Sequence, residues 1–353
     1  MENYSSLAVK YRPSNFKDII GQKDITNFLQ KAIQINKIPH TILFYGNKGI
    51  GKTSCARIFS KSVNCINFTK SLESCNICIN CKSNNINIKE IDAASNNSVE
   101  NIRNIIAQLN YKPYIGNYNI YIIDEAHMLS QSAFNALLKT IEEPPNHVIF
   151  ILITTEKYKI IPTVLSRCQI FEFKTISEKD IIDNLKIIAL KENFKIKDEF
   201  FLEIANRCDG SFRDSLFLLD KLSLSSNSSD LNNQIQITNK HKYIFLIKNI
   251  CNKDITKSLH TLNELLYKNT EYRYVIYMLT THIRNMLILF NNKNEDICDF
   301  EEIKFHYLKL IKLININFII NAIKIMHECD INYYRSYNKK LHIEISIIKI
   351  CAF

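Results

Sequence analysis

The stretch that decides the fold reads Gly46-Asn47-Lys48-Gly49-Ile50-Gly51-Lys52-Thr53, and Ser54 follows it. It lies between an apolar run at 42–45 and a helix-like stretch, which is the setting that a Walker A loop requires. Its glycines allow backbone N–H groups to curl around phosphate oxygens at a helix N-terminus. We therefore expect 46–54 to bind nucleotide, with Lys52 on the terminal phosphates and the Thr53 hydroxyl on magnesium. A chance glycine-rich turn is the alternative.

Apolar runs and helical patterns alternate along the first half of the chain. Strands are predicted at 42–45, 86–91, 120–123, 148–153 and 169–173. Helices are predicted before the first strand, after the glycine-rich turn, at 99–109, and from 130 to the prolines at 144 and 145. Strands that alternate with helices favour a parallel sheet covered on both faces. The predicted fold class is therefore α/β.

The strand pattern ends near Ser177, which with Asp180 resembles a capping box at the start of a helix. We expect a nucleotide-binding domain at 1–176 and a small helical domain at 177–222. A polar stretch at 223–240, which includes Ser-Ser-Asn-Ser-Ser-Asp at 225–230, indicates a linker. The remainder, 241–353, is again helical in pattern.

Two carboxylates, Asp124 and Glu125, follow the apolar run at 120–123. They would lie at the carboxyl end of a strand, where open α/β sheets bind their ligands. Taken alone, two acids after a strand are more often a solvated turn. Because a Walker A loop precedes them, we expect Asp124 to hold magnesium and Glu125 to orient and deprotonate an attacking water.

Four cysteines fall in one loop at 65–81: Cys65, Cys75, Cys78 and Cys81. Tetrahedral zinc prefers four thiolates, and the tight C-x2-C-x2-C spacing gathers three of them with little loss of chain entropy. We expect a structural zinc site with no open position and hence no catalytic role. Reduced, unliganded thiols are the alternative, and an iron–sulfur cluster is a weaker rival because its runs use other spacings.

Composition narrows the class of protein without deciding its function. Hydrophobic residues make up 46% of the 353 residues and charged residues 23%, as in folded globular proteins. The formal charge of +10 suits a nucleic-acid partner, although lysine-rich codon bias explains it equally well. We see no signal peptide or membrane span and expect a cytoplasmic protein whose 11 cysteines stay reduced.

The order of motifs resembles the gamma/tau subunits of the bacterial DNA polymerase III clamp loader, closely over residues 5–222 and weakly beyond. The resemblance rests on Tyr11-Arg12-Pro13, Gly21-Gln22, the Walker A loop, the cysteine loop, Glu90 to Ser95, Asp124 to Leu129, Phe134 to Pro145, and Ser166-Arg167-Cys168. It implies an AAA+ P-loop fold with a zinc-binding loop at 65–81, a helical lid at 177–222 and an oligomerisation collar at 241–353.

The resemblance also implies roles for single residues. Arg167 would act as an arginine finger on ATP bound by a neighbouring subunit. Thr155 would sense the γ-phosphate, and Arg213 would be the second sensor, on the lid. Tyr11 and Arg12 would join the nucleotide-binding residues.

The activity implied by the resemblance is ATP-driven opening of the beta sliding clamp and its loading onto primed DNA, within a DNA polymerase holoenzyme. The partners would be delta and delta-prime type subunits, further copies of this chain, the clamp and DNA. Two features depart from the pattern. Asn96, Asn97 and Ser98 stand where relatives carry basic residues, and the sequence ends at the collar, so we expect no tau-type extensions for helicase or polymerase contacts.

Two other functions remain open at this point. One is a nucleotide-binding scaffold subunit of the same complex that hydrolyses nothing. Such subunits typically have a degraded P-loop, whereas the P-loop here is intact. The other is a different AAA+ motor on DNA, such as a branch-migration helicase. The cysteine loop and Ser166-Arg167-Cys168 give little support to that alternative.

Overall fold

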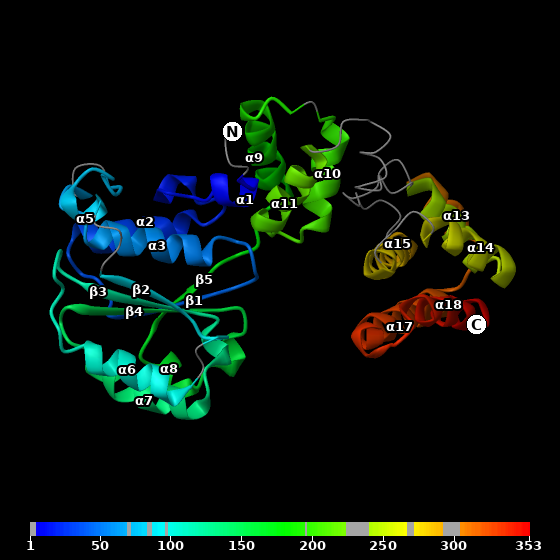
Figure 1. The fold of residues 1–353 in the computed structure, drawn as a ribbon. Coiled ribbons are helices and arrows are strands. Elements are labelled where there is room, and N and C mark those ends of the chain that lie inside the picture. Colours follow the sequence, from blue (N-terminus) through cyan, green and yellow to red (C-terminus); the bar gives the residue numbers. More distant parts are fainter. Residues whose placement is uncertain are drawn as a thin grey trace. The chain divides into compact units, whose positions relative to one another are not determined.

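The computed structural model describes residues 5–68, 72–82, 87–95, 98–194, 196–223, 240–266, 272–291 and 304–353. The chain forms two compact units, Met1–Ser225 and Ser226–Phe353, which are described separately (Figure 1). The predicted linker at 223–240 lies outside the described residues from 224 to 239. Asn96 and Asn97 also lie outside them.

A five-stranded parallel sheet forms the centre of the first unit, in the order β2-β3-β4-β1-β5. Its strands are β1 (Thr41–Tyr45), β2 (Ile88–Asp92), β3 (Asn119–Asp124), β4 (Val148–Thr154) and β5 (Gln169–Glu172). Every residue of β4 is buried, as expected for a central strand with helices on both faces. The predicted α/β fold with a parallel sheet is confirmed, with strand ends shifted by one or two residues.

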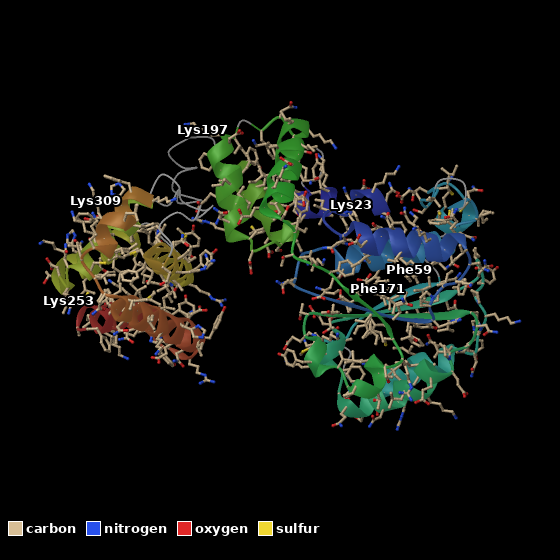
Figure 2. All side chains as sticks on the ribbon, turned by 180° about the vertical axis from the view of Figure 1, so that it is seen from behind. Lys23, Phe59, Phe171, Lys197, Lys253 and Lys309 are labelled. Atoms are coloured by element: carbon tan, nitrogen blue, oxygen red, sulfur yellow. The ribbon has the colours of Figure 1, made fainter. Side chains whose placement is uncertain are left out.

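Helices cover both faces of this sheet (Figure 1). On one face lie α2 (Lys23–Gln34) and α3 (Lys52–Val63), and on the other lie α6 (Val99–Gln108), α7 (Gln131–Glu142) and α8 (Pro162–Leu165). Because successive strand residues point to opposite faces, Phe44 of β1 joins the core under α3, whereas Leu43 joins the core under α7. Figure 2 labels Phe59 and Phe171, which belong to the α3 side, while the labelled Lys23 is exposed.

Short elements connect these layers. They are α1 (Leu7–Lys10), η1 (Phe16–Asp18), α5 (Ile79–Lys82), η2 (Ala126–Met128) and η3 (Lys157–Lys159). Predicted site residues lie in or directly beside three of them: Tyr11 follows α1, Cys81 lies in α5 and Glu125 precedes η2. Most important for the site is η2, because it follows Asp124 and Glu125 directly at the end of β3.

Three further helices belong to the first unit: α9 (Glu178–Lys191), α10 (Asp198–Arg207) and α11 (Phe212–Ser223). The first of them begins as predicted, since Ser177 Oγ accepts the Asp180 N–H at 3.1 Å and donates to the Asp180 carboxylate at 2.7 Å. Helix α1 packs against α11, where the Leu7 N–H donates to the buried Asp220 carboxylate at 3.2 Å. The N-terminal segment is thereby anchored to this helical group.

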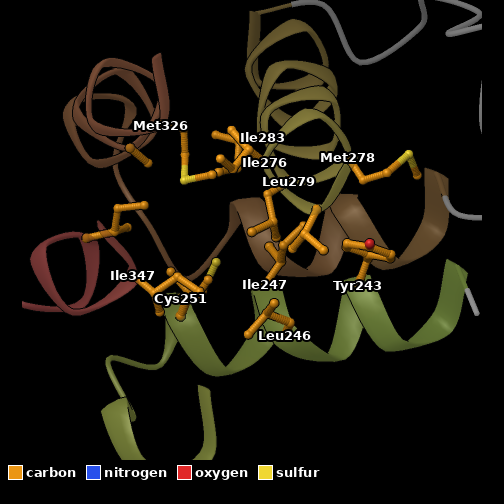
Figure 3. Packing of buried hydrophobic residues seen from close by; sticks show 14 of the residues in the cluster. Tyr243, Leu246, Ile247, Cys251, Ile276, Met278, Leu279, Ile283, Met326 and Ile347 are labelled. Carbon is orange, nitrogen blue, oxygen red and sulfur yellow. The ribbon is translucent and has the colours of Figure 1, made fainter. Parts of the chain in front are cut away.

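The described part of the second unit consists of helices. They are α13 (Lys240–Cys251), α14 (Ile255–Leu266), α15 (Tyr272–Asn291), α16 (Lys304–Ile311), α17 (Ile316–Asn332), η5 (Tyr333–Arg335) and α18 (Lys339–Cys351). Their apolar faces meet in one core, which includes Ile247, Leu279 and Met326 (Figure 3). None of the helices described in either unit is long and apolar enough to cross a membrane.

Candidate nucleotide-binding site

The glycine-rich turn connects the end of β1 to the start of α3. Gly51, with φ 101°, is the N-cap of α3, and no side chain among the described residues caps this end. The first N–H groups of a helix have no intrahelical partner, and the helix dipole is positive there. With no acidic residue in its first turn, α3 presents a site suited to phosphate oxygens.

Gly49 brings this turn close to α11. The Arg213 N–H donates to the Gly49 carbonyl at 3.3 Å, so the loop and the helical group touch through their backbones. Gly49 has φ +77°, and a Cβ placed on it would lie 2.0 Å from Ser211 Oγ. A residue without a side chain is therefore required for this approach.

Lys52 is the first residue of α3, and its side chain turns back onto the loop. The residue is only 7% exposed, and Nζ donates to the carbonyls of Gly46 at 2.7 Å and Asn47 at 2.5 Å. Burial lowers the pKa of Lys52, while the charges of Glu125 and Asp124 oppose that shift. The loop thus holds a buried cation at the place where a Walker A lysine meets phosphate.

Asp124 and Thr53 form the oxygen-rich part of the site. The Thr53 hydroxyl donates to Asp124 Oδ2 at 2.8 Å, and Asp124 Oδ1 accepts the Glu125 N–H at 2.9 Å. Magnesium prefers one or two protein oxygens together with phosphate and water oxygens. The hydroxyl and the carboxylate converge beside the phosphate-binding turn, so this donor set fits the ion.

Glu125 has an unusual backbone, with φ 48° and ψ 44°. This left-handed conformation is costly for a residue with a side chain and tends to occur at functional sites. It brings Glu125 into the pocket wall beside Asp124. Glu125 Oε2 is buried without a hydrogen-bond partner among the described residues, and the nearest basic group is the His127 ring.

One pocket collects most of the predicted nucleotide-binding residues. Its cavity volume is about 170 Å³. The predicted site residues that line it are Tyr11, Arg12, Lys48, Gly49, Ile50, Gly51, Lys52, Thr53, Ser54, Asp124, Glu125 and Arg213. Gly46 and Asn47 do not line the pocket, but their carbonyls accept hydrogen bonds from Lys52, which does.

Apolar residues that the sequence analysis did not single out complete the wall. They are Ala8, Ile19, Ile20, Ile176, Phe212 and Leu216. Their signal in the sequence is weak, because they come from segments far apart in the chain. Phe212 is the exception, since it directly precedes the predicted Arg213.

The charges around the pocket favour a polyphosphate. Burial lowers the pKa of Arg12, and the nearby positive charges of Arg57 and Arg213 lower it further. Tyr11 donates to Glu192, and burial with this hydrogen bond raises its pKa to about 12. The tyrosine therefore stays neutral while the neighbouring arginines supply positive charge.

Thr155 and Arg167 are not gathered into this pocket. Thr155 follows the end of β4, where it is the preceding Thr154 whose hydroxyl contacts His127 at 3.0 Å. Arg167 lies beyond α8, donates to the Thr163 carbonyl at 2.8 Å and forms an ion pair with Glu142 at 2.7 Å. Its guanidinium is thus held on the surface of α7 and α8.

The four predicted cysteines come together beside α3 and α5. Their sulfur atoms all lie within 4.8 Å of one another. Tetrahedral zinc with Zn–S bonds of about 2.3 Å needs sulfur atoms roughly 3.8 Å apart. Hydrogen bonds from the backbone N–H groups of Ile77 and Cys78 lower the pKa of Cys75 to about 6, which favours its thiolate. The donor set therefore fits a closed, four-thiolate metal site.

Several known proteins are similar to this chain. A family model described as DNA polymerase III, delta subunit, matches residues 21–177. The Bacillus subtilis DNA polymerase III subunit tau is 36% identical over 99% of this chain, which spans 63% of that protein. The gamma subunit of Buchnera aphidicola from Acyrthosiphon pisum is 39% identical over 78% of each chain.

Among solved structures, the Thermotoga maritima RuvB Holliday junction branch migration motor aligns with a TM-score of 0.49 and 19% identity, over 68% of this chain and 79% of that one. The sequence relatives decide the family. Because the Buchnera protein is 39% identical and 78% covered, the chain belongs to the gamma/tau subunit family of bacterial DNA polymerase III.

Proposed function

We propose that this chain is the ATPase motor subunit of a DNA polymerase III clamp loader. The observation that carries the proposal is a single pocket lined by the phosphate-binding turn, the Thr53–Asp124 pair, Glu125 and Arg213. Its relatives are replication subunits by name. ATP binding and hydrolysis would open the beta sliding clamp and load it onto primed DNA.

The pocket residues suit the parts of phosphoryl transfer to water. Lys52 and the N–H groups that begin α3 would bind the β- and γ-phosphates, and Arg12 and Arg213 would add positive charge. Glu125 would orient a water and take its proton as the water oxygen bonds to the γ-phosphorus and the bond to ADP breaks. Thr53 and Asp124 would hold Mg²⁺, which when bound neutralises phosphate charge.

Two further residues would act outside their own pocket. Arg167 would reach ATP in a neighbouring subunit as an arginine finger, and its surface position supports this role. Thr155 would sense the γ-phosphate from the end of β4. Both roles imply an assembly with copies of this chain and delta and delta-prime type subunits, with 177–222 as the lid and 241–353 as the collar.

The cysteine cluster would bind one structural zinc ion. Four thiolates satisfy a tetrahedral ion completely, so the ion would stabilise the loop at 65–81 without taking part in hydrolysis. We also propose a cytoplasmic location, where the other thiols stay reduced.

The test is steady-state ATP hydrolysis by the purified chain mixed with delta and delta-prime type subunits, with and without clamp and primed DNA. We expect strong stimulation that Arg167→Ala abolishes. Glu142→Gln is the matched control, because it removes the same ion pair but keeps the guanidinium. Tight ATP binding without turnover in any mixture would favour the scaffold function. Equal losses in Arg167→Ala and Glu142→Gln would argue against an arginine finger.

A further inference from the structure

His127 lies between the ends of β3 and β4, and the proposed chemistry has not used it. Its side chain is only 8% exposed. Ring Nδ1 lies 3.0 Å from Thr154 Oγ1 and 3.5 Å from Glu125 Oε2, and ring Nε2 lies 3.4 Å from Glu156 Oε1. One buried imidazole thus joins the pocket carboxylate Glu125 to the turn that follows β4.

The β4 side of this contact is firmly held. Thr154 is fully buried, and its hydroxyl also accepts the Glu156 N–H at 3.0 Å. Its carbonyl accepts the Gly46 N–H at 3.3 Å, which ties it to the start of the phosphate-binding turn. Glu156 is held in turn by Lys159 at 2.9 Å. His127 therefore rests against a rigid part of the site.

The Glu125 side of the contact is less constrained. Its left-handed backbone places the carboxylate in the pocket wall, but Oε2 has no hydrogen-bond partner among the described residues. A carboxylate that takes a proton from water needs one fixed orientation, because small misplacements of a reacting group are costly. His127 Nδ1 lies 3.5 Å from Oε2, and such contacts often tighten when substrate binds.

We propose that His127 is a positioning residue for Glu125. Its ring fixes the orientation of the Glu125 carboxylate relative to Thr154 at the end of β4. Because the Thr154 carbonyl is bonded to Gly46, the carboxylate is also oriented relative to the glycine-rich turn. His127 is not among the residues that line the pocket. The inference rests on the proposed ATP hydrolysis.

The first test compares three substitutions in the full chain, assayed in the same mixture with delta and delta-prime type subunits, clamp and primed DNA. Asn places a polar atom near the position of Nδ1, whereas Gln places one near Nε2, and Ala places neither. We expect kcat for ATP to fall on the order of 10- to 100-fold in His127→Ala and His127→Gln, with KM and ATPγS affinity unchanged. His127→Asn recovers most of the rate. His147→Ala, which removes a half-buried histidine bonded to the Leu109 carbonyl, leaves kcat unchanged.

The second test asks whether His127 acts through Glu125. In a Glu125→Gln background, we expect His127→Ala to cause no further loss, because residues that act through one contact are not additive. An additive loss overturns the proposal. So does an equal rate in Asn and Gln variants, an unchanged kcat in His127→Ala, or a fall in ATPγS affinity that parallels kcat. If the wild-type chain hydrolyses no ATP even when mixed with delta and delta-prime type subunits, clamp and primed DNA, the proposed function fails too.

Discussion

Gly49 is the point where the phosphate-binding turn meets α11, and replacing it with alanine should loosen the first unit. The new Cβ would lie 2.0 Å from Ser211 Oγ, so Ser211 must rotate away. That rotation breaks its hydrogen bonds with Asp214, to the carboxylate at 2.7 Å and from the N–H at 3.4 Å. The helix then loses its N-terminal cap.

The magnitude follows from two costs. A non-glycine residue in the left-handed region costs about 1–2 kcal/mol, and loss of an N-cap costs about 1 kcal/mol. Gly49→Ala should therefore lower the free energy of unfolding by about 2–3 kcal/mol. Gly21 is the matched control, because its φ of +75° is almost the same but its nearest neighbour lies at 3.5 Å, an ordinary contact. Gly21→Ala should show the backbone cost alone.

Urea unfolding followed by circular dichroism measures both variants against wild type. We expect Gly49→Ala to be less stable than Gly21→Ala by about 1 kcal/mol. In a Ser211→Gly background the two substitutions should become equal, because the clashing hydroxyl is gone. Equal stabilities in the wild-type background would refute the close approach of loop and α11.

Three further predictions concern other parts of the molecule. Metal analysis of the wild type should find one zinc per chain. Cys75→Ser should lose the zinc and several degrees of thermal stability, whereas Cys168→Ser should keep both. A metal-free wild type would contradict the zinc site. Hydrogen bonds from Lys10 and Tyr11 lower the pKa of Glu192. The contribution of the ionised Glu192 to folding stability is therefore complete above the unfolded pKa of about 4.3 and disappears as pH falls through the lower, folded pKa. The stability difference between wild type and Glu192→Gln should therefore be present at pH 7 and vanish in acid, and a difference that persists in acid would argue against this contact. Ile347 is fully buried, so Ile347→Ala should destabilise the second unit by about 2–5 kcal/mol in thermal unfolding. Ile345 is 42% exposed, so Ile345→Ala should change the stability by less than about 0.5 kcal/mol. Similar effects of the two substitutions would contradict the packing of α18.

The sheet and the glycine-rich turn between β1 and α3 could be predicted because their signals are local. Strands β1, β3 and β4 are buried on both faces, so each appears as an unbroken apolar run. The glycine-rich turn carries its own conformation in its residue types. The four cysteines were equally readable, since the residues that come together in space are also close in sequence.

The remainder of the site depended on contacts between distant segments. The apolar wall joins Ile20, Ile176 and Phe212, which no periodicity links. The anchoring of α1 by Asp220 crosses 213 residues, and an acidic residue inside a helix carries no sign of such a partner. His127 likewise reads as an ordinary residue of its motif until β4 places Thr154 beside it.

The central claim is that the pocket of the first unit both binds and hydrolyses ATP, with Glu125 taking the proton from water. The most direct measurement is phosphate release from MgATP by the wild-type chain and by Glu125→Gln, each mixed with delta and delta-prime type subunits, clamp and primed DNA, alongside ATPγS affinity for each. We predict equal affinity in both proteins and phosphate release slowed on the order of 10²- to 10⁴-fold in Glu125→Gln. Binding without phosphate release in the wild type, or equal release in Glu125→Gln, would contradict the claim.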